Sequence, residues 1–272
     1  KKENHYQMLK KLELSKEHTE ILFNYSKKKG IIFISTPYDP DSANFLNKIG
    51  VKIFKTASAD LSDYILHKAI SKFNKSVIIS TGMSNITDIE KCLNIYKSRN
   101  KISLLHCVSN YPCSPESINL NVLNTLKKKF KCTIGYSDHS VGNVASITAV
   151  SKGYKILERH LTLNKLDKGP DHQSSLEPDE FKKFVNDIRL VEKVSGNNIK
   201  SCQPEEKEMK MVSSKSLHVK KDMFAGDKIC EDDLISKRPG NGISPANFKK
   251  VLNRKLKNNI KKGNQLKYKN LI

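Results

Sequence analysis

Polar or ionisable side chains stand at the ends of six short apolar runs in this 272-residue sequence. They include one lysine, several hydroxyls and three histidines: Ser35 and Thr36; Lys55 and Ser58; Ser80 and Thr81; His106 and Ser109 to Tyr111; Ser137 to His139; and Glu158 to His160. If the runs are parallel strands, their carboxyl ends meet on one face, which is where closed (β/α) sheets carry their active sites. The sequence therefore predicts that these residues share one site.

The lysine and the hydroxyls suit a phosphorylated anion, because an ammonium group supplies charge and hydroxyls donate hydrogen bonds to phosphate oxygens. His139 and His160, on neighbouring runs, could coordinate a divalent ion whose other positions are left to water and substrate. Two separated histidines are not a metal motif by themselves, so ordinary hydrogen-bonded histidines remain the alternative. His106 lies within an apolar run, which favours a hydrogen-bonded core histidine. Asp171 follows the last run in a short turn and could reach over the same face.

The six runs alternate with amphipathic helical segments, and this alternation predicts parallel βαβ units. The expected strands are Ile31 to Ser35, Lys52 to Ala57, Ser76 to Thr81, Ile102 to Val108, Cys132 to Ser137 and Tyr154 to Leu161. The expected helices are about Leu12 to Lys29, Ser42 to Ile49, Leu61 to Phe73, Ile86 to Lys97, Leu120 to Lys129, Val144 to Lys152 and Pro178 to Val194. A (β/α)8 barrel needs eight strands, so it would place two strands and a helix upstream of Lys1. An open doubly wound sheet is the alternative.

The pattern changes after Asn197. Residues 201–208 are polar and contain Pro204, which is typical of a linker. Short apolar runs and turns follow, up to a tail rich in Lys and Asn. We therefore expect an incomplete catalytic barrel at 1–200, a linker at 201–208 and a small β-rich domain at 209–272.

The composition narrows the class of protein. Lysine and arginine number 49 against 28 Asp and Glu, so the formal net charge is +21. Basic surfaces can bind nucleic acid, but these lysines are spread along the whole chain, so we expect a solvated surface and no nucleic-acid partner.

Six cysteines without a C-x-x-C pair predict buried free thiols. No run reaches the roughly 20 apolar residues of a membrane span, so we expect a cytoplasmic protein without a membrane partner. Histidines outside the six runs are expected at the surface: His5, His18, His67 and His218.

Eight motifs, in order and across almost the whole chain, resemble the sialic acid (N-acetylneuraminate) synthase family, which includes the legionaminate and pseudaminate synthases. They are Phe33 to Pro37, Phe54 to Ser58, Ile79 to Met83, Leu105 to Pro112, Gly135 to His139, Ile156 to His160, Gly169 to His172 and Lys237 to Gly242. Each motif alone is weak, whereas eight in register are specific. The resemblance implies an α/β fold, a (β/α)8 TIM barrel followed by an antifreeze-like (SAF) domain, in a domain-swapped homodimer.

The resemblance also implies a reaction, in which phosphoenolpyruvate condenses with an N-acylated mannose-type sugar to give a nonulosonic acid and phosphate. It implies that phosphoenolpyruvate is held by Thr36, Lys55, Ser58, Ser80, Ser109 and Ser137. Tyr111, Glu158 and Asp171 would be catalytic and contact the sugar, and Arg238 of the partner subunit would reach the N-acyl group. His139 and His160 would bind Mn²⁺ or Mg²⁺.

The sequence departs from the family at several places. The family often has Glu where this chain has Asp60, and Asn where it has Ser109. Its first two strands carry a catalytic Glu and a phosphate-binding Lys that these 272 residues do not include. A catalytically incomplete fragment and a non-enzymatic binding protein on the same scaffold are therefore the alternatives. The 3-deoxy-heptulosonate and 3-deoxy-octulosonate synthases share the chemistry and the barrel, but they would not explain residues 238–242.

Overall fold

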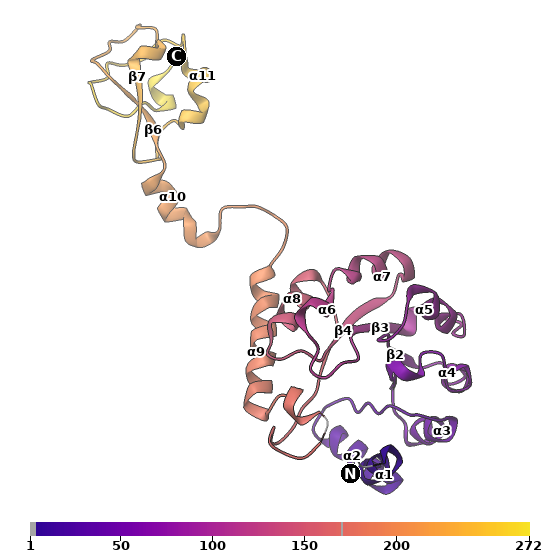
Figure 1. The fold of residues 1–272 in the computed structure, drawn as a ribbon. Helices are drawn as coiled ribbons and strands as arrows, with labels where there is room; N and C mark the ends of the chain where they lie inside the picture. The colour runs from indigo at the N-terminus through magenta and orange to yellow at the C-terminus, as the bar shows by residue number, and fades with distance from the viewer. Residues whose placement is uncertain (1–3, 170) are drawn as a thin grey trace. The chain divides into compact units, whose positions relative to one another are not determined.

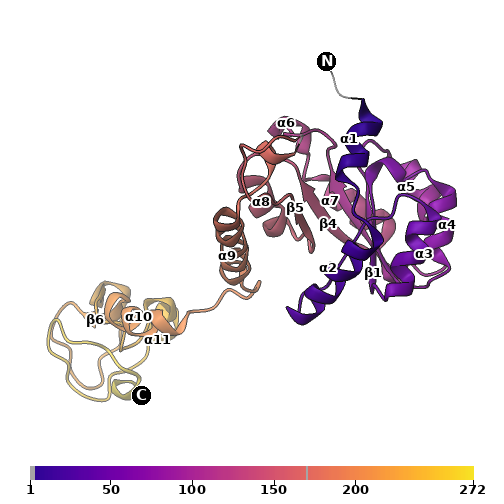
Figure 2. The ribbon, with the colours of Figure 1, turned by 90° about the horizontal axis from the view of Figure 1, so that it is seen from below.

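The computed structural model describes residues 4–169 and 171–272, and the chain divides into two compact units between Gly196 and Asn197. In the first unit, five parallel strands follow one another across the sheet in chain order. They are β1 (Ile53–Thr56), β2 (Ser76–Ser80), β3 (Ile102–Cys107), β4 (Thr133–Asp138) and β5 (Leu157–Arg159). The sheet is curled like half a barrel, with helices along its outer side (Figures 1 and 2).

The helices of the first unit precede, connect and follow these strands. They are α1 (His5–Leu12), α2 (Lys16–Lys28), α3 (Pro40–Ile49), α4 (Tyr64–Ser71), α5 (Ile86–Leu93), α6 (Pro115–Ile118), α7 (Val122–Phe130), α8 (Val144–Lys152) and α9 (Pro178–Ser195), with 3-10 turns η1 (Ser58–Asp60), η2 (Arg99–Lys101) and η3 (His172–Ser174). Local sequence explains where they begin and end. Asp39 caps α3 by accepting a hydrogen bond from the Ser42 amide at 2.8 Å, and Gly50 ends it with a φ of 97°.

The core of the first unit lies between the sheet and its helices. Phe54, Ile79 and Leu104 are fully buried on the face of the sheet that the helices cover. Lys55 and Ile78, which lie on the opposite face, are only partly buried. The register pairs Cys107 with Ser137 and Ser137 with Glu158. Cys107, Ser137 and Glu158 therefore lie in one row across the carboxyl ends of β3, β4 and β5.

The structure confirms five of the six expected strands and corrects the first. The run from Ile31 to Ser35 has no regular secondary structure and pairs with no strand of the described residues. Its side chains are not packed like a core strand, since Ile31 and Ile32 are largely exposed. The eight-stranded closure of a TIM barrel is not confirmed, because β1 and β5 are the two ends of the sheet formed by the described strands.

The expected helices are all present, with shifted ends, and Val144 to Lys152 has the bounds that we expected. Sequence reasoning missed α1 and α6. α6 is only four residues long, and the apolar side chains of α1 are not packed into the core, with Leu9 and Leu12 exposed. Short or exposed helices leave little periodicity to detect.

The second unit has its own core. Strand β6 (Ser216–Val219) pairs antiparallel with β7 (Leu234–Lys237), and the unit also contains α10 (Lys207–Ser213), α11 (Phe248–Val251) and the turns η4 (Pro204–Glu206), η5 (Glu231–Asp233), η6 (Pro245–Asn247) and η7 (Tyr268–Asn270). Leu217, Val219 and Leu256 form the centre of the core. Within residues 201–208, expected as a linker, the structure has η4 and the start of α10.

Several other expectations need correction. His67 is fully buried and His218 is 7% exposed, because each side chain finds hydrogen-bond partners inside. His18 is exposed as expected, and the side chain of His5 lies outside the described residues.

Cys92, Cys107 and Cys113 are buried free thiols, as expected, whereas Cys202 and Cys230 are exposed. In the described part of the chain, no helix has the length and apolarity needed to cross a membrane.

Candidate active site

Lys55 lies at the centre of the polar cluster on the carboxyl edge of the sheet. It is on β1, and its Nζ donates a hydrogen bond to Ser80 Oγ of β2 at 2.7 Å. The same Nζ lies 3.4 Å from Glu158 Oε2 of β5. β1 and β5 are the two ends of the sheet, so the curl of the sheet brings side chains from opposite ends together.

Glu158 connects this lysine to β4. Ser137 Oγ donates a hydrogen bond to Glu158 Oε1 at 2.7 Å, as the register between β4 and β5 allows. Both carboxylate oxygens are therefore engaged, one by a hydroxyl and one by an ammonium group. The Lys55 side chain is 12% exposed and the Glu158 side chain 37% exposed, so the pair opens to solvent on the glutamate side.

Ser58 and Ser109 meet at a glycine on the loop after β2. The Gly82 amide donates a hydrogen bond to Ser58 Oγ at 3.0 Å, and Ser58 Oγ lies 3.2 Å from Cys107 Sγ. A β-carbon at Gly82 would collide with Ser109 Oγ. The sequence marks Gly82 only as a turn residue, but the structure shows that the close approach of two serines requires it.

His139 lies at the end of β4 with a defined proton arrangement. Its Nδ1 is 2.7 Å from the carbonyl oxygen of Val108, which can only accept, so Nδ1 carries the proton. Nε2 lies 3.2 Å from Ser137 Oγ. The single hydroxyl proton of Ser137 goes to Glu158, so the lone pair of Nε2 has no proton donor there. Burial is the main cause that lowers the pKa of His139, which keeps the imidazole neutral.

His160 and Tyr111 complete an aromatic group around His139. The ring centroids of His139 and His160 are 5.4 Å apart, and the planes are perpendicular. The Tyr111 ring lies 4.1 Å from the His139 ring and 5.3 Å from the His160 ring. Burial raises the pKa of the Tyr111 phenol to about 12, so it remains a hydrogen-bond donor at neutral pH. His160 Nδ1 is 3.5 Å from Asp171 Oδ2.

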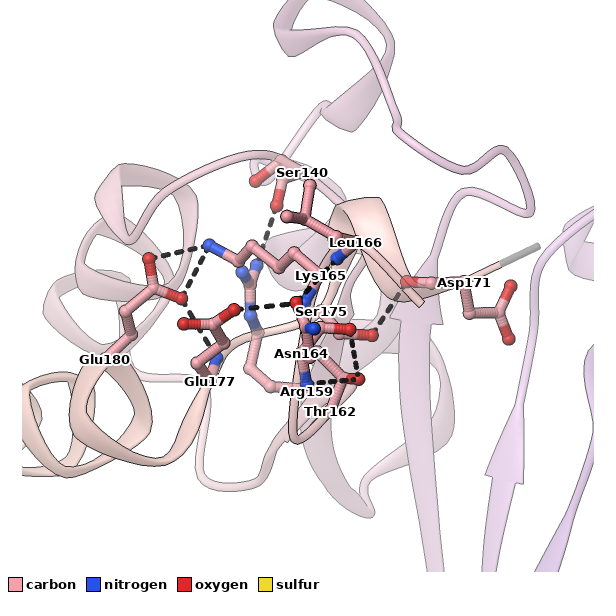
Figure 3. A network of polar contacts seen from close by, with 10 residues as sticks. All are labelled: Ser140, Arg159, Thr162, Asn164, Lys165, Leu166, Asp171, Ser175, Glu177 and Glu180. Carbon is pink, nitrogen blue, oxygen red and sulfur yellow. Dashed lines mark hydrogen bonds and ion pairs between the residues drawn. The ribbon is translucent and has the colours of Figure 1, made fainter. Parts of the chain in front are cut away.

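A network of polar contacts holds the loop that carries Asp171 (Figure 3). The Ser175 hydroxyl donates to the Asp171 carbonyl oxygen at 2.7 Å. Lys165 Nζ pairs with Glu180 at 2.6 Å, which ties the loop to the start of α9. These contacts fix the loop backbone, while the Asp171 carboxylate remains about half exposed and faces His160.

A buried ion pair that sequence reasoning missed joins the ends of β4 and β5. Arg159 Nη1 is 2.9 Å from Asp138 Oδ2, and both side chains are essentially inaccessible to solvent. Arg159 Nη1 also donates to the Ser140 carbonyl oxygen at 2.9 Å. Each partner precedes one histidine in the chain. The polar Asp-His and Arg-His dipeptides at two strand ends were the available signal.

Two predicted site residues stand apart from this cluster. Thr36 is half-buried in the extended segment before α3, and no hydrogen bond among the described residues joins it to Lys55 or the serines. Arg238 belongs to the second unit, where its Nε donates to the Ser213 carbonyl oxygen at 3.1 Å. The structure therefore brings together Lys55, Ser80, Ser137, Glu158 and His139 through direct contacts.

The histidine pair fits a divalent cation in part. Imidazole nitrogens suit Mn²⁺ and related metals, and each ring points its Nδ1 at an oxygen atom, which leaves Nε2 available. No group of three or more His, Cys, Asp or Glu side chains in residues 4–169 and 171–272 is arranged to hold a metal. A cation here would therefore need water or substrate oxygens as further ligands.

Comparison with known proteins places the chain in a family. The model described as the NeuB family matches residues 1–200, and the SAF domain model matches residues 214–272. N,N'-diacetyllegionaminic acid synthase of Campylobacter jejuni is 40% identical over 264 residues, which is 95% of this chain and 79% of that protein. The enzyme of the same name from Legionella pneumophila is 36% identical over 269 residues, or 96% of this chain and 75% of that protein.

Solved structures agree. The N-acetylneuraminic acid (sialic acid) synthetase of Leptospira borgpetersenii is 37% identical, with a TM-score of 0.68 over 72% of this chain and 70% of that one. The family expected from the eight motifs is thereby confirmed. The chain belongs to the NeuB family and carries a SAF domain at residues 214–272.

Proposed function

We propose that the protein condenses phosphoenolpyruvate with an N-acylated mannose-type sugar to form a nonulosonic acid and inorganic phosphate. The sugar is N-acetylmannosamine or a diacetamido-trideoxy analogue, and the product is N-acetylneuraminate or legionaminate. One observation carries the proposal: Lys55, Ser80 and Ser137 converge on the same sheet edge as His139, Tyr111 and His160. Names of relatives as legionaminic and sialic acid synthases support it.

The lysine and the hydroxyls account for the anionic substrate. Phosphoenolpyruvate carries a phosphate and a carboxylate, which need positive charge and hydrogen-bond donors. Lys55 supplies the charge, and its low exposure strengthens the interaction. The donors that we assign to the anion are the hydroxyls of Thr36, Ser58, Ser80, Ser109 and Ser137.

The reaction forms a carbon–carbon bond and breaks a carbon–oxygen bond. C3 of phosphoenolpyruvate attacks the aldehyde carbon of the open-chain sugar, water adds at C2, and the tetrahedral intermediate expels phosphate. Tyr111, Glu158 and Asp171 are assigned to the sugar hydroxyls. Tyr111 donates a hydrogen bond through its phenolic hydroxyl, while the two carboxylates accept hydrogen bonds from sugar hydroxyls.

His139 and His160 are the residues that would hold Mn²⁺ or Mg²⁺. A divalent cation supplies charge stabilisation at a carbonyl oxygen when it is bound. The chain's own contribution is to orient the two imidazoles: the Val108 carbonyl oxygen fixes the His139 ring and Asp171 faces the His160 ring.

We also assign Arg238 to the N-acyl group, reached from a partner subunit in a domain-swapped homodimer. The guanidinium group of Arg238 is exposed within its own unit and has donors to spare beyond Ser213. A dimer would complete the site with a residue that the first unit does not contain.

The test is an assay of the full-length protein with phosphoenolpyruvate, Mn²⁺ and either sugar. The expected result is phosphate release that requires the sugar, together with the matching nonulosonic acid. The sugar that supports turnover identifies the branch of the family. Phosphate release that is equal with and without either sugar would contradict the proposal, as would no release with both sugars. No release together with salt-sensitive binding of nucleic acid would favour a binding protein on the same scaffold.

A further inference from the structure

Glu158 has contacts that its assignment to the sugar does not explain. Its carboxylate accepts a hydrogen bond from Ser137 Oγ at 2.7 Å and lies 3.4 Å from Lys55 Nζ. Those two side chains are donors that the proposed function assigns to phosphoenolpyruvate. We propose that the Glu158 carboxylate occupies the anion subsite of the free protein and sets its affinity for phosphate. This inference rests on the proposed function.

The first argument concerns the donors. Ser137 has one hydroxyl proton and can donate it to Glu158 or to a substrate oxygen, but not to both. The Nζ of Lys55 already donates to Ser80 Oγ and to the Thr56 carbonyl oxygen at 3.3 Å, so few of its protons remain. A phosphate oxygen that takes the Ser137 proton must therefore displace the carboxylate.

The second argument concerns charge. A carboxylate and a phosphate that share one lysine repel each other, and the repulsion is strong at short distance in a partly buried site. Without a ligand, Glu158 neutralises Lys55, so the ammonium group is not left unpaired on burial. With a ligand, the same negative charge opposes binding unless it moves.

The third argument concerns freedom to move. The Glu158 side chain is about three times as exposed as that of Lys55, at 37% against 12%. The glutamate can therefore turn toward solvent while the lysine stays on its strand. The displaced carboxylate is then free to accept a hydrogen bond from a sugar hydroxyl, which agrees with its assigned role.

The experiment measures binding of inorganic phosphate to the full-length protein by calorimetry. Glu158→Gln keeps the shape and removes the charge, and Glu158→Ala removes the occupant. We expect both to tighten phosphate binding by about tenfold, the scale of one hydrogen bond to a charged group. Thermal melting verifies that each variant is folded.

Glu90→Gln is the matched control. Glu90 also pairs with a lysine, Lys129, at 3.0 Å and is similarly exposed, but it lies on α5 away from the sheet edge. Its substitution should leave the phosphate affinity unchanged. In a Lys55→Met background, the gain from Glu158→Gln should be smaller, because the carboxylate then releases only the Ser137 hydroxyl and no ammonium group.

Two results would overturn the inference. One is unchanged or weaker phosphate binding in both folded Glu158 variants. The other is an equal gain with Lys55→Met, which would mean that Glu158 acts by general repulsion. The proposed function is tested separately from this inference. One combination of results is that the wild-type protein releases no phosphate from phosphoenolpyruvate and sugar while Glu158→Gln still tightens phosphate binding. That combination would support the anion subsite and contradict the condensation.

Discussion

Two charge pairs lie at the carboxyl edge of the same sheet, and their surroundings are opposite. Asp138 and Arg159 are 0% and 1% exposed and are joined at 2.9 Å. Lys55 and Glu158 are 12% and 37% exposed and lie 3.4 Å apart. The buried pair has no route by which either partner could turn away. We therefore infer that the Asp138–Arg159 pair stabilises the fold, whereas in the Lys55–Glu158 pair a ligand can replace the carboxylate.

Hydrogen bonds around the two carboxylates support this difference. Asp138 accepts from the Ser140 amide at 2.9 Å, from the Ser140 hydroxyl at 2.6 Å and from the Ser146 hydroxyl. Glu158 accepts from Ser137 alone besides its lysine, among the contacts of the described residues. A carboxylate with many fixed donors is pre-organised, and one with few is replaceable.

Breaking the buried pair should have the largest effect on stability. Asp138→Ala leaves the Arg159 guanidinium buried and unpaired, which costs about 3–5 kcal/mol of the free energy of unfolding. Two of its nitrogens already lack a partner in the described structure, so no other group compensates. Urea denaturation measures the loss. Arg189→Met is the control, because its pair with Glu192 is exposed on α9 and should change stability by less than about 0.5 kcal/mol.

Removing the lysine of the open pair should act on function more than on stability. Lys55→Ala removes the positive charge that faces the substrate anion, so we expect kcat/KM to fall by about 10²–10³. Steady-state phosphate release measures this effect. A kcat/KM of Lys55→Ala within a factor of two of the wild-type value would show that Lys55 does not bind the substrate anion.

A third charge pair, in the second unit, joins a buried carboxylate to an exposed lysine, and its contribution to stability should depend on pH. Asp233 is buried and accepts from Lys221 Nζ at 2.7 Å and from the Cys230 amide at 2.9 Å, and the Lys221 contact is the main cause that lowers its pKa. A lowered folded pKa contributes stability above the unfolded value of about 3.9, and this stability is lost as the pH falls through the folded value. Asp233→Asn should cost about 1–2 kcal/mol at pH 7. The difference from wild type should shrink toward pH 2, and a difference independent of pH would contradict this assignment.

The smallest effect is expected at the surface. Lys129→Met breaks an exposed pair with Glu90, so the free energy of unfolding should change by less than about 1 kcal/mol, and less still at high salt. A larger loss of the free energy of unfolding in urea denaturation would contradict the argument that exposed charge pairs contribute less to stability than buried ones.

Sequence patterns predicted the strands and the polar strand ends well, because both follow from local periodicity. The β-branched runs around Phe54 and Leu104 became buried parallel strands. The run from Ile31 to Ser35 has the same composition but forms no ladder. A strand depends on a neighbour in space, and composition does not reveal that neighbour.

The sequence predicted which residues belong to the candidate site but not which of them contact one another. Lys55, Ser137 and Glu158 stood out by position, yet the Lys55–Glu158 contact depends on the curl of the sheet, which joins its two ends. His67 was expected at the surface because it lies outside the six apolar runs, yet its side chain is fully buried. Its Nε2 donates to the Asp60 carbonyl oxygen at 3.1 Å, and its Nδ1 accepts from the Tyr96 hydroxyl at 2.6 Å. Only the tertiary structure creates these contacts.

The most direct test of the central claim follows the carbon atoms of phosphoenolpyruvate. The full-length protein is incubated with phosphoenolpyruvate labelled with ¹³C at all its carbons, Mn²⁺ and each acylated sugar, and the products are analysed by mass spectrometry. The account predicts a nonulosonic acid that carries every labelled carbon, with one phosphate released per acid. Both products should form about 10²–10³ times more slowly in Lys55→Ala. Labelled pyruvate in place of the acid, or equal products from the wild type and Lys55→Ala, would contradict it.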